Sequence, residues 1–201
     1  MTRSAELPSA RLLIVGPQGS GKGTQGVRIG DALAVPVIST GDVFRANVKA
    51  GTPLGLQVQS IIDAGDLVPD SLTSEIVRDR LTQADAANGF LLDGYPRNLG
   101  QVGDLDTFLN GRGEPLDAVI ELSVPREESI SRIAQRAIEQ GRTDDTEEVI
   151  ANRLAIYERE TAPILDVYRE RGIVDAIDGV GSLEEISARI FAALAARGIT
   201  G

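Results

Sequence analysis

Five short apolar runs are spaced along the chain. Most of them are continuously apolar, without polar residues in alternation, and such runs are typical of buried β-strands. They favour a parallel sheet that helices cover on both faces, and therefore an α/β fold. The pattern predicts strands over residues 11–15, 35–40, 90–93, 118–123 and 173–177.

The stretches between these runs predict helices over residues 22–33, 42–50, 54–64, 71–81, 125–140 and 183–196, and a further helix that begins at residue 146. Asp70 is predicted to cap the N-terminus of the helix over 71–81. Pro163 is predicted to kink the helix that begins at residue 146. The segment 41–70 is too large for a plain crossover between strands, which indicates a helical subdomain.

The chain has 201 residues, of which 42% are apolar and 25% are charged, as expected of one globular domain with a full core. No apolar run approaches the ~20 residues that a membrane span requires. Residues 1–15 do not have the pattern of a signal peptide. We therefore expect a cytoplasmic protein that does not bind membranes.

The charged residues narrow the chemistry further. The chain has no Cys and no His, which excludes disulfides, zinc sites built from thiolates or imidazoles, and an imidazole general base. Its formal net charge of −10 argues against nucleic-acid binding, so an anionic substrate would need locally focused positive charge. Lys22 and Lys49 are the only lysines among 20 basic residues, and Lys22 stands in a Gly-rich loop. A compact ammonium group suits a narrow loop, which favours a functional Lys22.

The segment GPQGSGKGTQ, which begins at Gly16, resembles a phosphate-binding loop between a strand and a helix. Gly16, Gly21 and Lys22 fit the pattern G-x-x-x-x-G-K-[ST], but Gly23 stands where the hydroxyl that ligates Mg²⁺ is usual. The backbone N–H groups of residues 19–24 and the helix N-terminus would form an anion cradle. The alternative is a Gly-rich turn that binds nothing, and the flanking strand, helix and lysine argue against it.

Two further segments hold candidate ligands. GFLLDGYPR (89–97) places Asp93 at the end of a strand, where open α/β sheets bind ligands. Asp93 would support a metal on bound phosphates there, or cap a turn. ISTGDVFR (38–45) combines a hydroxyl group with Arg45, a pattern that alone predicts only a capped helix and a solvated arginine.

Arg132, Arg136, Arg142 and Arg153 bracket one predicted helix-turn-helix. Arg132 and Arg136 share a helix face because they are four residues apart. The arginines would either meet a phosphate or form a salt-bridged surface, and their spacing favours neither. The acids available for such a surface are Glu127, Asp144, Asp145 and Glu148.

Together these segments resemble the adenylate kinase family. The motifs GPQGSGKGTQ, ISTGDVFR, AGDLVPD, GFLLDGYPR, GRTDD and DGVG occur in the family's order over almost the whole chain. The resemblance implies the P-loop NTPase fold in a single domain over residues 1–201, with a parallel five-stranded sheet flanked by helices. It also implies a helical insertion that binds a nucleoside monophosphate (NMP), over about 39–70, and a short lid over about 136–146.

The resemblance further implies reversible phosphoryl transfer from MgATP to AMP, which gives two ADP and serves adenine-nucleotide homeostasis. Gly23 is the family's form, because its loop reads Lys-Gly-Thr and leaves Mg²⁺ mostly to phosphates and waters. Catalytic roles are implied for Lys22, Asp93, Arg97, Arg136, Arg142 and Arg153, with Asp93 supporting Mg²⁺ through water. ATP contacts are implied for Gly19, Ser20, Gly21, Lys22, Gly23, Thr24, Arg132, Arg136 and Gly181. AMP contacts are implied for Thr40, Arg45, Asp66, Leu67, Val68, Gly94, Tyr95, Pro96, Arg97, Gln101, Arg142 and Arg153.

Two residues depart from the family pattern. Gln18 stands where a small residue or proline is usual, and Phe44 stands where an aliphatic residue is usual. The interval between Arg136 and Arg142 is short, so the chain resembles the short-lid form, which holds no zinc. Within that lid, Asp144 and Asp145 would help to position it as it closes.

Two alternative functions stay open. A pyrimidine monophosphate kinase of the same fold would typically carry Ala and Asn where this chain has Thr40 and Gln101. A non-catalytic ATP-binding switch would need the phosphate cradle but no arginines on the acceptor side. We expect ATP, AMP and ADP as ligands, a monomer, and neither nucleic acid nor membrane as a partner.

Overall fold

The computed structural model describes residues 10–140 and 146–201 of the chain. A five-stranded sheet lies at its centre, and all strand pairs in the order β2-β3-β1-β4-β5 are parallel. The fold class predicted from the apolar runs is therefore confirmed. The strands are β1 (Ala10–Val15), β2 (Val37–Ser39), β3 (Gly89–Asp93), β4 (Ala118–Ser123) and β5 (Val174–Asp178).

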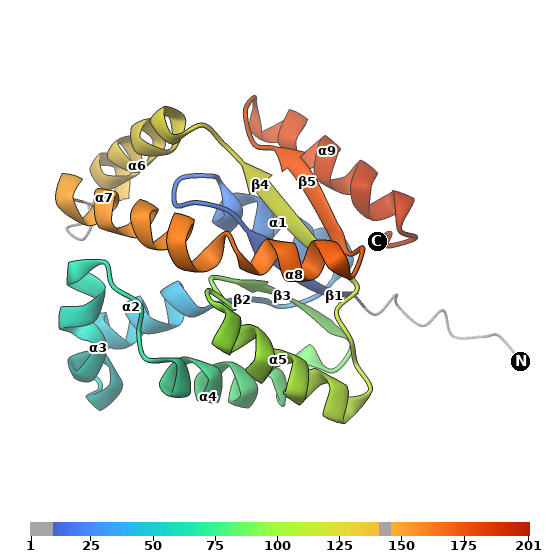
Figure 1. Ribbon diagram of the computed structural model, residues 1–201, viewed down its shortest axis with the longest axis horizontal. Helices are drawn as coiled ribbons and strands as arrows, with labels where there is room; N and C mark the ends of the chain where they lie inside the picture. The colour runs from blue at the N-terminus through green and yellow to red at the C-terminus, as the bar shows by residue number, and fades with distance from the viewer. Residues whose placement is uncertain (1–9, 141–145) are drawn as a thin grey trace, which may run out of the picture.

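Helices cover both faces of this sheet, as Figure 1 shows. Leu12 and Ile14 of β1 belong to a core with α1 and α9, whereas Leu13 and Val15 belong to a core with α4, α5 and α8. Side chains alternate along a strand, so one continuously apolar strand contributes to both cores. The helices are α1 (Lys22–Leu33), α4 (Asp70–Leu81), α5 (Leu99–Arg112), α8 (Ile164–Glu170) and α9 (Leu183–Ala196).

Two further helix pairs extend beyond the sheet. Helices α2 (Thr40–Ala50) and α3 (Pro53–Ala64) follow β2, and α6 (Arg126–Gln140) and α7 (Glu147–Ile156) follow β4. A π-helical turn then joins α7 to α8, and Pro163 follows it, so the chain breaks its helix where the proline predicted a kink. A short 3₁₀ turn over Ala84–Ala86 precedes β3.

Helices α2 and α3 share an apolar cluster with the start of α4. Phe44, Val58 and Val68 are its buried members, and Leu72 and Ile76 of α4 pack against it. An NMP-binding insertion over about 39–70 remains a prediction.

Two local predictions are wrong. Asp70 does not cap α4, because Pro69 occupies the N-cap position and Asp70 begins the helix itself. Helix α5 is missing from the prediction because Gly100, Gly103 and Gly111 lower the helix propensity of its sequence. Each of the other predicted helices lies within two residues of its observed ends, except where the π-helical turn interrupts the last but one.

The parallel sheet brings the ends of all its strands to one edge. Val15, Ser39, Asp93, Ser123 and Asp178 are the last residues of the strands. Open α/β sheets bind their ligands at this edge. The phosphate-loop segment, the start of α2 and the turn after β3 all leave the sheet here, so the fold gathers the segments that the sequence singled out.

The close packing of α3 against α2 depends on Gly55. A Cβ atom at this position would overlap the backbone carbonyl of Asn47, which cannot move aside as a flexible side chain can. We expect Gly55→Ala to destabilise this helix pair by roughly 1–3 kcal/mol. Hydrogen exchange over α2 and α3 should become faster than in the unmodified protein.

Gly103 of α5 is the matched control, because it is also a helical glycine but an added Cβ meets nothing within 4 Å. Gly103→Ala should stabilise the protein by roughly 0.5–1 kcal/mol, since alanine loses less conformational entropy on folding. If hydrogen exchange over α2 and α3 is unchanged in Gly55→Ala, the two helices can move apart without a loss of stability.

Candidate active site

The loop between β1 and α1 is shaped by its glycines. Gly19 and Gly21 have φ angles of 80° and 93°, a region that residues with side chains rarely adopt. A Cβ on Gly16 would lie 2.6 Å from the carbonyl oxygen of Leu122 in β4. The loop therefore needs glycine both for its turns and for its close approach to the sheet.

The N-terminus of α1 is well suited to bind an anion. Gly21 is its N-cap residue, which provides no side-chain cap, and its first turn holds no acidic residue. The first N–H groups of a helix have no partner within the helix, so an anion can accept their hydrogen bonds. Several other helices begin with a side-chain cap instead. The capping residues are Ser39, Thr52, Asn98, Thr146 and Ser182.

Lys22 begins α1, and its ammonium group folds back over the loop. Its Nζ donates hydrogen bonds to the carbonyl oxygens of Gly16 at 2.6 Å and Pro17 at 2.9 Å. Removal of the ammonium group from water lowers the pKa of Lys22 to about 8, and the nearby carboxylate of Asp93 opposes this shift. The lysine is therefore fixed at the mouth of the loop in an environment that disfavours its charge.

Guanidinium groups from separate elements lie near this lysine. Arg97 and Arg136 both act to lower the pKa of Lys22 further. Burial lowers the pKa of Arg97 itself, Asp93 opposes that shift, and Arg153 acts in the same direction as burial. Cations are thus crowded together in a chain whose formal net charge is −10. Such a local concentration of positive charge is suited to bind several phosphates.

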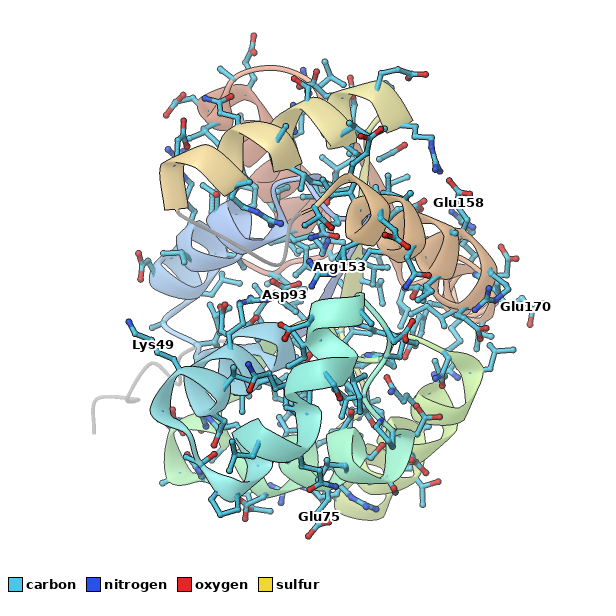
Figure 2. All side chains as sticks on the ribbon, turned by 90° about the vertical axis from the view of Figure 1, so that its left-hand side faces the viewer. Lys49, Glu75, Asp93, Arg153, Glu158 and Glu170 are labelled. Carbon is cyan, nitrogen blue, oxygen red and sulfur yellow. The ribbon has the colours of Figure 1, made fainter. Side chains whose placement is uncertain are left out.

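A cavity of about 1000 Å³ lies between the phosphate loop, the helices α2 and α3, and α6. Figure 2 shows Asp93 and Arg153 in the middle of the molecule, between α2 and α3 below and α6 above. Predicted contacts of both nucleotides therefore lie around one space. The predicted residues that line it are Gly19, Gly21, Lys22, Gly23, Thr24, Thr40, Arg45, Asp66, Leu67, Val68, Asp93, Gly94, Pro96, Arg97, Gln101, Arg132, Arg136, Arg153 and Gly181.

Other predicted residues lie elsewhere. Ser20 and Tyr95 are buried and do not line the cavity. The hydroxyl oxygen of Tyr95 lies 2.9 Å from that of Ser74, so this ring helps to hold α4 on the core. Arg142, Asp144 and Asp145 lie outside the described residues.

The arginines of α6 and α7 have different surroundings. Arg132 forms an ion pair at 2.6 Å with Glu128 on its own helix, an acid that the sequence did not single out. Arg153 donates a hydrogen bond of 3.1 Å to the carbonyl oxygen of Ile62 near the end of α3. Arg136 lies close enough to Lys22 to influence its pKa. The ion pair of Arg132 is what the alternative of a salt-bridged surface predicts for that residue.

Among the predicted AMP contacts at the cavity, Gln101 has a buried side-chain amide. Its Oε1 accepts a hydrogen bond of 2.8 Å from the backbone N–H of Arg97, and its Nε2 donates one of 2.7 Å to Asp70. Thr40 nearby donates to the carbonyl oxygen of Gly94 at 2.9 Å. Asp70 is a residue that the sequence indicated only as a helix cap. Because 31 residues separate it from Gln101, no local pattern reveals the contact.

The two residues that depart from the family pattern both lie at the cavity. Gln18 follows Pro17 in the phosphate loop, the segment that also leads to Lys22. Phe44 is 6% exposed and packs in the apolar cluster of α2 and α3. Its neighbour Arg45 forms an ion pair of 2.6 Å with Asp42.

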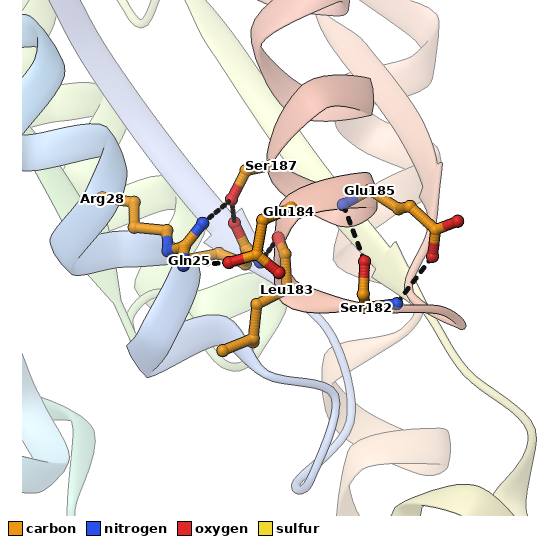
Figure 3. Close-up of polar contacts among 7 residues, drawn as sticks. All are labelled: Gln25, Arg28, Ser182, Leu183, Glu184, Glu185 and Ser187. Atoms are coloured by element: carbon orange, nitrogen blue, oxygen red, sulfur yellow. Dashed lines mark hydrogen bonds and ion pairs between the residues drawn. The ribbon is translucent and has the colours of Figure 1, made fainter.

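A hydrogen-bond network joins α1 to the N-terminus of α9, as Figure 3 shows. The amide of buried Gln25 donates to the carbonyl oxygen of Leu183 at 3.1 Å and accepts from the hydroxyl group of Ser187 at 2.7 Å. Arg28 donates to Ser187 at 3.0 Å and to Glu184 at 2.9 Å. The sequence singled out none of these contacts. They fix the first turns of α9 against the helix that follows the phosphate loop.

Known proteins share this combination of features. A family model described as Adenylate kinase matches residues 14–173 of the chain. The chain belongs to the adenylate kinase family. It is similar to the adenylate kinase of Leifsonia xyli subsp. xyli, with 57% identity over 188 residues that cover 94% of each chain.

Two other adenylate kinases are nearly as similar. That of Kocuria rhizophila is 55% identical over 184 residues, which cover 92% of this chain and 98% of the relative. That of Micrococcus luteus is 52% identical over 192 residues, which cover 95% and 94%. The family and the enzyme class expected from the sequence are confirmed, and nothing among these relatives favours a pyrimidine kinase or a non-catalytic switch.

The sequence predicted no membrane span and no zinc site, and it predicted that Asp93 supports Mg²⁺ through water. Within residues 10–140 and 146–201, no helix combines the length and apolarity needed to cross a membrane. The same residues contain no group of three or more Asp, Glu, His or Cys side chains placed to hold a metal ion.

Nucleotide binding should be coupled to protonation of Lys22. Its pKa of about 8 means that Lys22 is charged below pH 8 and loses its proton above it. Phosphates beside it favour the ammonium form and raise this pKa. Below pH 8 the lysine is charged with or without a nucleotide, so affinity is insensitive to its titration. Above pH 8 binding must take up a proton, and affinity for ATP should fall as pH rises.

Calorimetry in buffers of different ionisation enthalpy would measure this uptake. We expect about one proton per ATP at about pH 9 and almost none at about pH 7. Lys22→Met is the control, because it lacks the titrating group and should lose the uptake at high pH. An unmodified protein that takes up no proton at the higher pH would refute the coupling.

Proposed function

We propose that the chain catalyses reversible transfer of the terminal phosphoryl group of MgATP to AMP, giving two ADP, and so serves adenine-nucleotide homeostasis. The observation that carries this proposal is the crowding of Lys22, Arg97, Arg136 and Arg153 around one cavity. A phosphate loop with its lysine suffices for one nucleotide. Additional cations on the facing helices are useful when a second phosphate must be held against the first.

The reaction needs alignment and charge neutralisation more than proton transfer. An oxygen of the AMP phosphate attacks the γ-phosphorus while the bond from this phosphorus to the bridging oxygen of ADP breaks. Negative charge spreads over the transferred group during this step. Guanidinium groups suit it because they stay charged and can bind two phosphate oxygens at once. We assign this role to Arg136, Arg142 and Arg153.

On the ATP side, the N–H groups of residues 19–24 would bind the phosphates. The positive φ angles of the loop and the uncapped N-terminus of α1 support this assignment. Lys22 would lie against the β- and γ-phosphates, close to where its ammonium group already lies. The remaining ATP contacts that we propose are Arg132, Arg136 and the backbone near Gly181.

On the AMP side, Arg97 would bind the phosphate of the acceptor. Its guanidinium group is buried, and its Nε donates a hydrogen bond of 2.8 Å to the carbonyl oxygen of Gly94, which fixes its direction. Gln101 would bind the adenine edge through its amide. The other AMP contacts that we propose are Thr40, Arg45, Asp66, Leu67, Val68, Gly94, Tyr95, Pro96, Arg142 and Arg153.

Mg²⁺ fits the residues at this site. Asp93 is a carboxylate at the end of β3 that lies near both Lys22 and Arg97. Mg²⁺ usually keeps several waters and is held by one or two carboxylates and substrate phosphates. Asp93 would hold it through water, and the ion would supply neutralisation of phosphate charge. The proposal includes no zinc, because the chain has neither Cys nor His.

We further propose that residues 1–201 form a single domain with two mobile parts. These are the insertion over about 39–70 and the short lid over about 136–146. Helices α6 and α7 would act as rigid arms on either side of the lid. Closure would expel water, so that ATP is not hydrolysed before the acceptor binds. A monomer that acts in the cytoplasm completes the proposal.

Acceptor specificity tests the proposed reaction directly. We expect kcat/KM for AMP to exceed that for CMP, UMP and GMP by roughly 100-fold or more, because a buried amide left without its partner disfavours the wrong base. Diphosphate formation from MgATP and each monophosphate would measure it. Faster turnover of CMP or UMP than of AMP would replace the proposal by a pyrimidine kinase, and no turnover of any acceptor would support a binding protein.

Two arginines should show opposite kinetic defects. Arg97→Ala should raise KM for AMP by more than about tenfold, because it would bind the acceptor phosphate in the ground state. Arg142→Ala should lower kcat by about 100-fold or more with a much smaller change in ATP affinity, because its contact would strengthen in the transition state.

Steady-state kinetics and calorimetric affinities for both variants would separate these effects. Arg80→Ala is the matched control, since Arg80 forms its ion pair with Asp85 on a surface that does not line the cavity. It should leave both constants unchanged. A wild-type kcat in Arg142→Ala would return that residue to a salt-bridged surface.

A further inference from the structure

A side-chain amide can face a purine base in two ways. Turned one way, its oxygen and nitrogen match the amino group and N1 of adenine, which are a donor and an acceptor. Turned by 180°, it matches a 6-oxopurine instead, in which O6 accepts and N1–H donates. The two orientations of Gln101 have nearly the same shape, so packing alone distinguishes them poorly. Hydrogen-bond partners must therefore determine which end of the amide is the oxygen and which is the nitrogen.

In this structure, two neighbours of Gln101 fix the orientation of its amide. The carboxylate of Asp70 can only accept, so the amide end that lies 2.7 Å from it must be the nitrogen. The backbone N–H of Arg97 can only donate, so the end of the amide that lies 2.8 Å from this backbone nitrogen must be the oxygen. The side chain of Gln101 is 2% exposed, and water therefore cannot easily replace either partner.

This arrangement still leaves hydrogen-bonding capacity for a base. The amide nitrogen has two hydrogens and gives one to Asp70, and the amide oxygen has two lone pairs and uses one for Arg97. One donor and one acceptor remain on a side chain that lines the cavity. Under the proposed function, the donor and the acceptor on the edge of adenine would use both.

Asp70 is itself held in place. It lies in the first turn of α4, where a negative charge is stabilised by the helix dipole. The side-chain nitrogen of Asn98 donates to the same oxygen of Asp70 at 2.9 Å. The acceptor presented to Gln101 is therefore fixed by two helices.

We propose that Asp70 is a specificity-determining positioning residue, which holds the amide of Gln101 in the orientation that pairs with adenine and not with a 6-oxopurine. This inference rests on the proposed function, in which Gln101 binds the base of the acceptor. Asp70 does not touch the nucleotide in this account. It acts by raising the free energy of the flipped amide, in which two acceptors would face each other at Asp70 and two donors at Arg97.

The test compares AMP with inosine monophosphate (IMP), whose base differs in the donor and acceptor order of this edge. Asp70→Leu removes the acceptor, and the kcat/KM ratio of AMP to IMP should fall by roughly tenfold or more. Asp70→Asn can still present an oxygen to the nitrogens of Gln101 and Asn98, so it should keep most of the ratio. If Asp70→Leu does not fold, Asp70→Ala removes the same acceptor with less bulk and should lower the ratio equally.

Asp104→Leu is the matched control. Asp104 also links α4 to α5, by accepting a hydrogen bond of 2.8 Å from Ser74, but it does not line the cavity. A purely structural loss at this helix pair should change the rates with AMP and IMP together and leave their ratio unchanged. A fall of the ratio in Asp104→Leu equal to that in Asp70→Leu would overturn the inference.

Gln101→Leu separates the inference from the function on which it rests. If the ratio stays at its wild-type value in Gln101→Leu, the proposed role of Gln101 in acceptor selection is wrong. If Gln101→Leu loses the preference for AMP but Asp70→Leu keeps it within about twofold of wild type, only the role of Asp70 is wrong. Loss of the preference in both variants, with retention in Asp70→Asn, is the result that we expect.

Discussion

Repulsion among like charges is the constraint on which the rest of this structure depends. Carbonyl oxygens, which are polar but not charged, hold three of the crowded cations. Lys22 donates to the loop carbonyls, Arg97 to that of Gly94, and Arg153 to that of Ile62. A carbonyl orients a cation but leaves its charge in place, whereas a carboxylate would neutralise that charge. Ion pairs with acids occur both away from the cavity, as between Arg171 and Asp106, and at it, where Arg132 pairs with Glu128.

The fold supplies these carbonyls because each of them comes from the end of a regular element. The loop carbonyls follow β1, that of Gly94 follows β3, and that of Ile62 lies in the last turn of α3. Backbone groups at such ends have no partner within their own strand or helix. The parallel sheet brings the strand ends to one edge, so the carbonyls after β1 and β3 and the side chains that donate to them meet there.

The fold and the phosphate-loop segment could be predicted from the sequence. Continuous apolar runs indicated a parallel sheet, and the spacing of glycines around Lys22 indicated the loop, because both signals are local. The contact between Asp70 and Gln101 and the network around Gln25 were missed, since their partners are far apart along the chain. Spacing could not assign the arginines either, because Arg132 and Arg136 share a helix on which each has an acid within one turn, Glu128 and Glu139.

The bond from Arg153 to Ile62 ties together two parts that the proposed reaction requires to move. The guanidinium group belongs to α7, beside the lid, and the carbonyl belongs to α3, in the insertion. The side chain of Arg153 then both places a positive charge at the cavity and connects α7 to α3. A lysine could keep the charge, but only a rigid plane with several N–H groups can reach a carbonyl and a phosphate in fixed directions. The reach of this one side chain therefore limits how far α3 and α7 can part before the charge leaves the cavity.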